Sequence, residues 1–454
     1  MNLAYRYPLI YWNTANLIVD SSGLDGDEEE DEEEDSKEKE KVNRAEKTVN
    51  YAKVGRAIGN FQSLGIKVVP PDINESKFTF APDEEHNAII YGLRGITGLS
   101  TEASREIIKY RPYHNVQDLL SLVKLKKPAI INLIKCGAFD QCENRPRAEI
   151  LHDYIDSIAD KKAVVNLRNM NMLINYELIP DDQAFYAQLF LLNKELKNQK
   201  YIPTEGMISF IENCDRLDFD DLMDDDGSIN AAKWDKVYKK IMKEMAAYLK
   251  ENQEAVLEQL NQCLFNEAAE KYMVGNESKW EMESVCYYYG KHELDYSNES
   301  FDDFSSLSPE PAVEKSFFGR DGRIIPIYQI FRIGGTVLGK NKLKNSITLL
   351  TQTGVVNVKI YKELFSHFDK QISAIGEEGK KKIIERSWFK RGTLLSISGI
   401  RRGDDFVLRS RKNSPFPAIA KITGIKDGFL EHQFERAKGT EEEEMEDEID
   451  DRIV

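Results

Sequence analysis

A change in the spacing of apolar residues at Ser316 constrains the fold more than any other feature of this sequence. Before it, apolar residues recur at helical spacing; after it, they alternate in short runs separated by glycines, which is typical of strands. Five strands are predicted, at Ile324–Thr336, Ser346–Thr351, Gly354–Tyr361, Thr393–Ile400 and Asp405–Arg411. Between the third and fourth we expect a helix at Lys362–Phe368 and further helical residues. This order suits an OB-fold barrel.

The part before Ser316 is predicted to be mainly helical. Met1–Val19 and Val49–Leu64 are apolar-rich segments at its start. Shorter helices are expected at Ser100–Lys109, Val116–Leu125 and Pro128–Cys136, the first opened by hydroxyl caps. Helical patterns follow at Arg147–Glu195 and at Ala232–Tyr272, the latter as one helix or two. The predicted fold class is therefore multidomain α+β, with helical N-terminal and middle parts before an all-β barrel.

Charge is segregated along the chain. The net charge is −16, and two acidic blocks, Asp25–Glu40 and Glu441–Asp451, carry much of it. Lys315–Thr440 instead holds 25 Lys and Arg against 11 Asp and Glu. Such a basic region predicts a nucleic-acid-binding module; the alternative is a solvated basic face without a partner. The first acidic block is expected to be a disordered loop or a mimic of nucleic acid, and the tail to aid solubility or to repel non-specific DNA.

Composition excludes several classes of protein. No apolar run approaches the roughly 20 residues that a membrane helix needs, and Met1–Ile18 has neither the uninterrupted apolar core nor the cleavage site of a signal peptide. The five cysteines are scattered without zinc-ligand spacing. They are interpreted as reduced thiols of a cytoplasmic protein, in a bacterial cell or, for a viral protein, in the host cytoplasm.

Four motifs occur in order along the chain: Gly65–Asn74, Tyr91–Leu99, Leu133–Asp140 and Trp280–Asp295. Together they resemble the C-terminal region of the bacterial and phage family C replicative DNA polymerase, the polymerase III α subunit. The resemblance implies the end of the fingers, a helix-hairpin-helix module, a clamp-binding region and an OB domain, without the PHP and palm domains. Taken alone, His292 in the last motif is interpreted as a satisfied surface or core histidine, and no catalytic role is assigned to it.

The hairpin module is placed at Gly95–Ile108. In such a motif a tight glycine turn exposes backbone N–H groups to a DNA phosphate at a helix N-terminus. Ser100 stands where the family has a second glycine; it can cap the helix but restricts φ. The predicted contacts to the duplex backbone are Arg94, Gly95, Thr97, Gly98, Ser100 and Lys109. Taken alone, the segment is also compatible with an ordinary helix and turn.

The OB region carries the predicted contacts to single-stranded DNA, because OB folds combine basic grooves with aromatic stacking platforms. The candidates are Lys340, Lys342, Lys344, Trp388, Phe389, Lys390, Arg391, Arg401, Arg402, Arg409 and Arg411. Trp388–Arg391 is the preferred cluster. The alternative is that its two aromatic rings are barrel core.

Family members carry a short clamp-binding peptide of glutamine and apolar residues. Two weak matches occur, at Gln188–Leu192, with Gln188, Leu189, Leu191 and Leu192 as the candidate contacts, and at Gln259–Phe265. Both lie in helical patterns, so ordinary core residues are the alternative reading.

No catalytic residues are predicted. A polymerase palm holds two metal ions with carboxylates. Asp218-Phe219-Asp220 has such spacing, but it lies in an acidic, loop-like run. We expect no cofactor or metal on this chain, with Mg²⁺ in a partner palm. The expected partners are template–primer and single-stranded DNA, a polypeptide carrying the palm and PHP domains, and a sliding clamp; none is a membrane.

The sequence is accordingly read as a DNA-binding part of a replicative polymerase, from a split gene or a truncated record. The expected parts are a fingers helix (1–20), an acidic insert (21–48), the hairpin region (49–145), a helical middle (146–298), a linker (299–315), the OB domain (316–430) and an acidic tail (438–454). The main alternative is a stand-alone, non-enzymatic DNA-binding accessory protein. A nuclease or RNA-binding factor is a third reading, for which no site is found.

Overall fold

The computed structural model describes residues 8–21, 51–217, 219–318, 323–375, 381–410 and 417–437. The acidic block Asp25–Glu40, the acidic tail and Arg411 lie outside the described residues. The chain divides into two compact units, residues 1–151 with 275–454, and residues 152–274. No helix in the described part of the chain combines the length and apolarity needed to cross a membrane.

The first unit begins with two helices and a small sheet. The helices are α1 (Leu9–Ser21) and α2 (Tyr51–Ser63), both at predicted positions. The sheet has the order β1-β3-β2, with β1 (Lys67–Val69) parallel to β3 (Ala88–Ile90) and β2 (Ala81–Asp83) antiparallel to it. Pro70 and Pro71 follow β1 directly, and proline has no N–H to extend a strand.

Short helices follow, and local signals begin three of them. They are η1 (Leu93–Gly95), α3 (Thr101–Lys109), α4 (Val116–Leu122), α5 (Lys127–Lys135), α6 (Asp140–Glu143) and α7 (Arg147–Ile158). Ser100 and Asn115 cap α3 and α4 by accepting the backbone N–H of the residue three positions on. Pro128 lies in the first turn of α5, where a missing N–H costs nothing.

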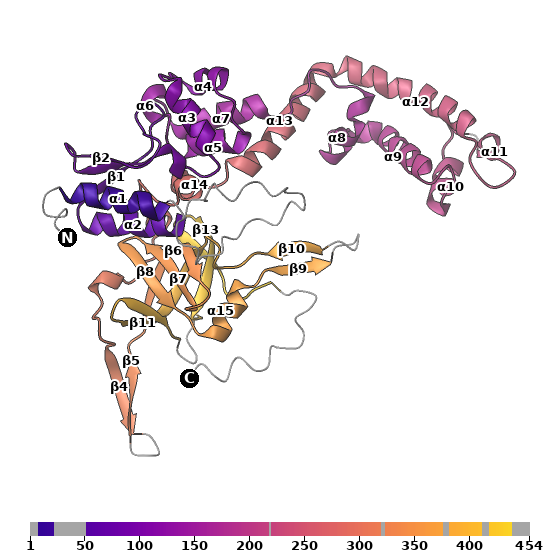
Figure 1. Ribbon diagram of the computed structural model, residues 1–454. Helices are drawn as coiled ribbons and strands as arrows, with labels where there is room; N and C mark the ends of the chain where they lie inside the picture. Colours follow the sequence, from indigo (N-terminus) through magenta and orange to yellow (C-terminus); the bar gives the residue numbers. More distant parts are fainter. Residues whose placement is uncertain are drawn as a thin grey trace. The chain divides into compact units, whose positions relative to one another are not determined.

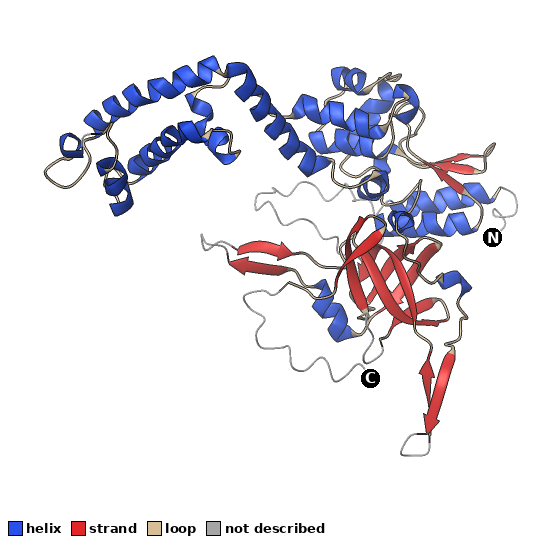
Figure 2. Cartoon of the chain, turned by 180° about the vertical axis from the view of Figure 1, so that it is seen from behind, coloured by secondary structure: helices blue, strands red, loops and turns tan. Residues whose placement is uncertain are grey.

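The strands after Ser316 close into a five-stranded barrel. Its members are β6 (Phe331–Asn341), β7 (Ser346–Thr351), β8 (Gly354–Lys359), β11 (Leu394–Arg402) and β12 (Asp405–Leu408). They pair in the circular order β6-β7-β8-β12-β11, with β8 and β12 parallel and β11 returning to β6. Helix α15 (Lys362–Asp369) lies between the third and fourth barrel strands, as predicted. Figure 1 shows this OB-like barrel, and Figure 2 shows it from behind with its strands in red. The predicted fold class is confirmed.

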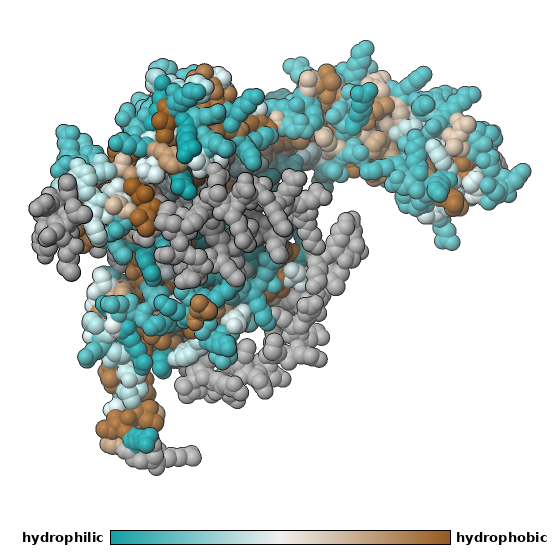
Figure 3. Space-filling model, in the orientation of Figure 1, coloured by the Kyte–Doolittle hydropathy of each residue, from teal (hydrophilic) through white to brown (hydrophobic). Residues whose placement is uncertain are grey.

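Three further hairpins surround the barrel. β13 (Ile419–Lys426) and β14 (Phe429–Gln433) extend the sheet beyond β11. β4 (Val313–Phe318) with β5 (Ile324–Tyr328), and β9 (Ile372–Ile375) with β10 (Lys381–Glu385), pair only with each other. The prediction of further helical residues before the fourth strand is therefore wrong, because antiparallel pairing with a neighbouring segment outweighs local helix propensity. The hairpin β4–β5 exposes apolar side chains such as Phe318, which is 78% exposed (Figure 3).

Residues 275–298 pack with the barrel, although the middle region was expected to extend to 298. They form α14 (Glu277–Val285) and η4 (Glu293–Tyr296). The Tyr288 hydroxyl lies 2.6 Å from Oγ1 of Thr336, and Nε2 of His292 lies 3.0 Å from the Leu350 carbonyl oxygen. The expected linker also packs on the barrel, since the ring of Phe304 in η5 (Phe304–Ser306) stacks edge-on against Phe406. These contacts make the barrel and residues 275–310 one structure.

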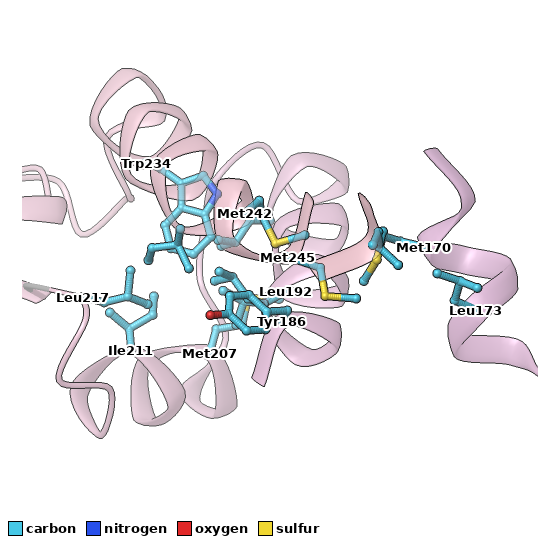
Figure 4. Close-up of a cluster of buried hydrophobic side chains, with 14 of the residues drawn as sticks. Met170, Leu173, Tyr186, Leu192, Met207, Ile211, Leu217, Trp234, Met242 and Met245 are labelled. Atoms are coloured by element: carbon cyan, nitrogen blue, oxygen red, sulfur yellow. The ribbon is translucent and has the colours of Figure 1, made fainter. Parts of the chain in front are cut away.

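The second unit is all helical around its own core. It contains the end of α7, then η2 (Leu167–Asn169), α8 (Met170–Asn175), η3 (Asp181–Gln183), α9 (Ala184–Asn198), α10 (Glu205–Glu212), α11 (Phe219–Leu222), α12 (Ala231–Glu251) and α13 (Gln253–Tyr272). The predicted helical pattern at Ala232–Tyr272 is thus two helices. Figure 4 shows Trp234 among leucines and methionines from several of these helices. Its indole N–H donates to Asn193 at 3.0 Å, so the buried ring leaves no unsatisfied donor.

Substituting alanine at Gly335 should destabilise the barrel by about 1–3 kcal/mol, as overpacking of a core does. A Cβ there would lie 2.4 Å from the Leu350 carbonyl oxygen on the paired strand, which cannot move without breaking the ladder. Chemical denaturation measures the change. Gly290→Ala is the control, because its Cβ would meet nothing closer than 3.9 Å. Equal stability of the two variants would contradict this packing.

Candidate nucleic-acid interface

A buried tyrosine supports the predicted hairpin from beneath. Tyr91 is fully buried, and its hydroxyl donates toward the carbonyl oxygens of Gly95 at 3.1 Å and Val285 at 3.0 Å. Phe80 packs edge-on against its ring at 4.7 Å. A Cβ on Gly95 would lie 2.5 Å from this ring, so only glycine fits there. Tyr91 therefore links the start of the hairpin to the end of α14 within the first unit.

The turn itself exposes backbone donors. Gly98 has φ +77°, a left-handed conformation that favours glycine. Ser100 has φ −73° and ψ 158°, an ordinary extended conformation, so the serine fits without strain. Its hydroxyl oxygen accepts the Ala103 N–H at 3.2 Å. Both Gly98 and Ser100 are exposed, and neither N–H is bonded within the described residues. This geometry suits an anion at the N-terminus of α3.

Two of the predicted contacts are instead occupied within the protein. The Gly95 N–H donates to Gly92 at 3.0 Å, and the Thr97 N–H donates to Ser284 of α14 at 2.8 Å. The Thr97 carbonyl oxygen accepts from Asn132 of α5 at 2.7 Å. Gly95 and Thr97 thus shape the turn, and their predicted direct backbone contact with DNA is not supported.

Cations lie on the elements before and after the turn. Lys109 is exposed, with its ammonium 4.9 Å from the ring centre of Tyr110. Arg94 is half-buried, with its guanidinium 5.9 Å from the ring centre of Phe78. Sequence reasoning missed Arg105 in α3 and the exposed lysines at 124, 126 and 127, the last of which begins α5. The cluster of three lysines within four residues was the signal that pointed to them.

The outer face of the barrel strands β6, β7 and β8 is covered by α2 (Figure 1). Leu338 and Leu350 are buried, although neither belongs to the barrel core. Gly59 permits this close approach, since a Cβ there would lie 2.3 Å from Val355. An OB fold commonly presents the face of its second and third strands to nucleic acid. Here that face packs against a helix, which leaves the hairpins of the barrel as the accessible part.

The predicted stacking platform at Trp388 and Phe389 is wrong. The two rings are 0% and 1% exposed and pack beside Phe368 and Phe365. The indole N–H of Trp388 donates to Glu385 at 2.8 Å. Closing the end of the barrel requires large side chains, so these rings are core and present no face to a base.

The predicted OB cations fall into three groups. Lys340 pairs with Asp369 at 2.8 Å, and Arg401 donates to the carbonyl oxygens of Phe304 and Leu307, so these two bond within the fold. Arg409 is half-buried, and its Nε is buried without a hydrogen-bond partner among the described residues. The remaining described candidates are at least partly exposed: Lys342, Lys344, Lys390, Arg391 and Arg402. Lys342 and Lys344 share the turn between β6 and β7.

The predicted clamp peptide is part of helix α9. Leu189 and Leu192 are buried in the core of the second unit, whereas Gln188 and Leu191 are exposed. Figure 4 shows Leu192 in this core. The second match lies in α13, with Leu260 and Leu264 buried. Both sets of apolar anchors are committed to packing, so neither peptide is available as predicted.

Metal-ligating groups do not converge in the described part of the chain. Among those residues, no group of three or more His, Cys, Asp or Glu side chains is placed to hold a metal ion. Asp218 lies outside the described residues.

Comparison with known proteins adds a family context. Residues 65–149 match the model of a helix-hairpin-helix motif. A probable DNA polymerase, YorL, of Bacillus subtilis is 36% identical over 433 residues, covering 91% of this chain and 32% of the relative. A DNA-directed DNA polymerase of Bacillus phage SPbeta matches equally. The DNA polymerase III subunit alpha of Thermus aquaticus is 33% identical over 102 residues, 21% of this chain and 8% of that protein. The chain spans about a third of the length of the Bacillus and phage relatives it matches.

Proposed function

Because this chain is similar to DNA polymerases of Bacillus subtilis and phage SPbeta across 91% of its length, and to a DNA polymerase III subunit alpha over 26% of it, we propose that it is the DNA-gripping C-terminal part of such an enzyme. The hairpin module binds the backbone of the template–primer duplex. The barrel guides the single-stranded template through its exposed turns. Helix α1 and the hairpin region complete the fingers.

The exposed turn at Gly98 and Ser100 carries this proposal. Two N–H groups at a helix N-terminus, with Lys109 on the same helix, offer donors and positive charge without side-chain chemistry for a particular base. Binding of this kind is independent of sequence, and counterion release makes it weaken steeply with salt. A polymerase that must pass every template sequence needs that property.

Catalytic aspartates and their Mg²⁺ are proposed to come from a separate polypeptide that carries the palm. The match covers 32% of the Bacillus relative, so most of that polymerase has no counterpart in this alignment. A sliding clamp remains a proposed partner, through a surface other than the buried leucines of α9. We place this activity in the cytoplasm. The alternative function is a stand-alone accessory protein that binds DNA without a palm partner.

Primer extension distinguishes these functions. The chain alone should shift a primed template without extending it, and extension with Mg²⁺ and nucleotides should appear only after a palm-bearing polypeptide is added. Extension by the chain alone would contradict the assignment of the catalytic residues. Binding without extension in every mixture would favour the accessory protein, and no binding to DNA would refute both.

Substituting valine at Gly98 should weaken duplex binding about tenfold, or roughly 1.4 kcal/mol, because a side chain disfavours the left-handed turn that aims the N–H groups. Fluorescence anisotropy with a labelled duplex measures the effect. Gly65→Val is a matched control: Gly65 is also exposed with φ +73° and open surroundings, but lies before β1. Equal losses in both variants would assign the effect to general strain.

A further inference from the structure

Two arginines from different segments converge on one aromatic ring beside the hairpin. The guanidinium carbon of Arg105, in α3, lies 5.4 Å from the ring centre of Phe78, and that of Arg94, in η1, lies 5.9 Å from the same centre. The two guanidinium carbons are therefore at most about 11 Å apart. The ring attracts both cations.

The ring is fixed relative to the hairpin by backbone contacts. The Leu93 N–H donates to Lys77 at 3.0 Å, and the Arg94 N–H donates to Phe78 at 3.1 Å. Gly92 lies so close to this segment that a Cβ would be 2.4 Å from the Thr79 carbonyl carbon. Residues 77–79 and 92–94 thus move as one piece with the turn. The backbone of Phe78 is thus bonded to η1, which lies just before the turn at Gly98.

The charge arrangement favours an anion. Arg105 is exposed, and within the described residues it makes no ion pair with Glu102 one turn away or with any other carboxylate. Arginine has a planar fork of donors that matches a phosphate, and a ring beneath it restricts the orientation of that fork.

We propose that Arg105 and Arg94, oriented by Phe78, form a second phosphate site that grips the same duplex strand as the hairpin. Arg105 lies five residues beyond Ser100 on α3, about 7.5 Å along the helix axis. At about 3.4 Å of rise per nucleotide of one strand, that spans roughly two nucleotides. The two sites therefore meet different phosphates and together fix the direction of the strand across α3. The inference rests on the proposed duplex binding.

The test is the salt dependence of duplex binding by the full chain. Arg105→Gln should weaken binding severalfold at low salt and lower the slope of log K against log salt by about 0.9, the value for one phosphate contact on a duplex. Lys67→Gln is the control, since Lys67 is an exposed cation on β1 of the same unit. A slope for Arg105→Gln equal to that of Lys67→Gln would overturn the proposal.

Two further variants separate the charge from its orientation. Arg105→Lys should restore the slope but not the full affinity, because it keeps the charge and loses the fork. Phe78→Leu keeps an apolar side chain and both arginines, and should lower affinity with a near-normal slope; full affinity would show that the ring does not orient the site. Failure of the parent chain to bind duplex would instead refute the proposed function. Normal hairpin effects with a silent Arg105→Gln would refute this inference alone.

Discussion

Arg147→Gln should lower the free energy of unfolding of the first unit by about 3–5 kcal/mol, the cost of breaking a buried ion pair on one side. Arg147 lies at the start of α7 and donates to Asp140 at 2.7 Å and to Glu281 at 2.9 Å. Its side chain is 10% exposed and that of Glu281 is 5% exposed. The two carboxylates raise the pKa of Arg147 despite its burial, so the charge is retained in the fold. Removing it leaves Glu281 buried without a counterion.

The ion pairs of Arg147 with Asp140 and Glu281 also fix α14, the helix with which the chain re-enters the first unit. Glu281 lies in α14, and it accepts the N–H groups of Tyr289 and Gly290 as well. The same helix supplies the Ser284 carbonyl that holds Thr97 in the hairpin. Loss of Arg147 is therefore expected to weaken duplex binding in addition to stability.

Chemical denaturation of the full chain measures the stability change. Lys359→Gln is the control, because its pair with Asp405 is half-exposed and should contribute about 1 kcal/mol or less. Arg147→Gln combined with Glu281→Gln should recover part of the loss by removing the stranded charge. If Arg147→Gln lost no more unfolding free energy than Lys359→Gln, the ion pairs of Arg147 would not stabilise the first unit.

Lowering the pH from 7 to 4.5 should remove about 2.5 kcal/mol of stability through His292 alone. Burial lowers the pKa of His292 from 6.5 to about 4, against smaller opposing effects of the Leu350 carbonyl and Asp295. Its Nδ1 accepts the Leu294 N–H, so Nε2 carries the proton that faces Leu350 in the neutral ring. The unfolded chain binds a proton below pH 6.5 and the folded chain does not. The stabilising contribution is therefore present above pH 6.5 and is lost as the pH falls toward 4.

The measurement compares unfolding free energies at the two pH values in the parent and in His292→Gln. Carboxylates titrate in the same range in both, so the difference between their pH dependences isolates the histidine. His114→Gln, at an exposed histidine, should leave the dependence unchanged. If His292→Gln retained the full acid sensitivity of the parent, the buried neutral histidine would not be its cause.

The barrel illustrates how far local pattern reaches. Strands such as β7 and β8 match their predicted ranges closely, because period-two alternation and glycine turns are written into the residues themselves. The hairpin turn before α3 was also predictable from the sequence, since Gly98 and Ser100 indicate a left-handed turn and a helix cap. The hairpin β9–β10 was missed because its strands are only four and five residues long and pair only with each other.

Site residues were harder to predict than elements. Trp388 and Phe389 stand beside Lys390 and Arg391 in the sequence, which suggested a stacking platform, yet the rings turn inward and become core. Arg105 was overlooked because nothing adjacent in the sequence marks it, and its relevance follows from Phe78, 27 positions earlier.

The order of modules, the class of the barrel and the turn of the hairpin follow from the residues alone, because they depend on side-chain period, caps and glycine conformations within short windows. Which charges are exposed and which faces are open depends on tertiary contacts. Helix α2 closes the outer face of β6–β8, Asp369 neutralises Lys340, and Phe78 gathers two arginines. Burial and pairing depend on contacts between residues far apart in the chain, and no local pattern encodes which of those contacts form.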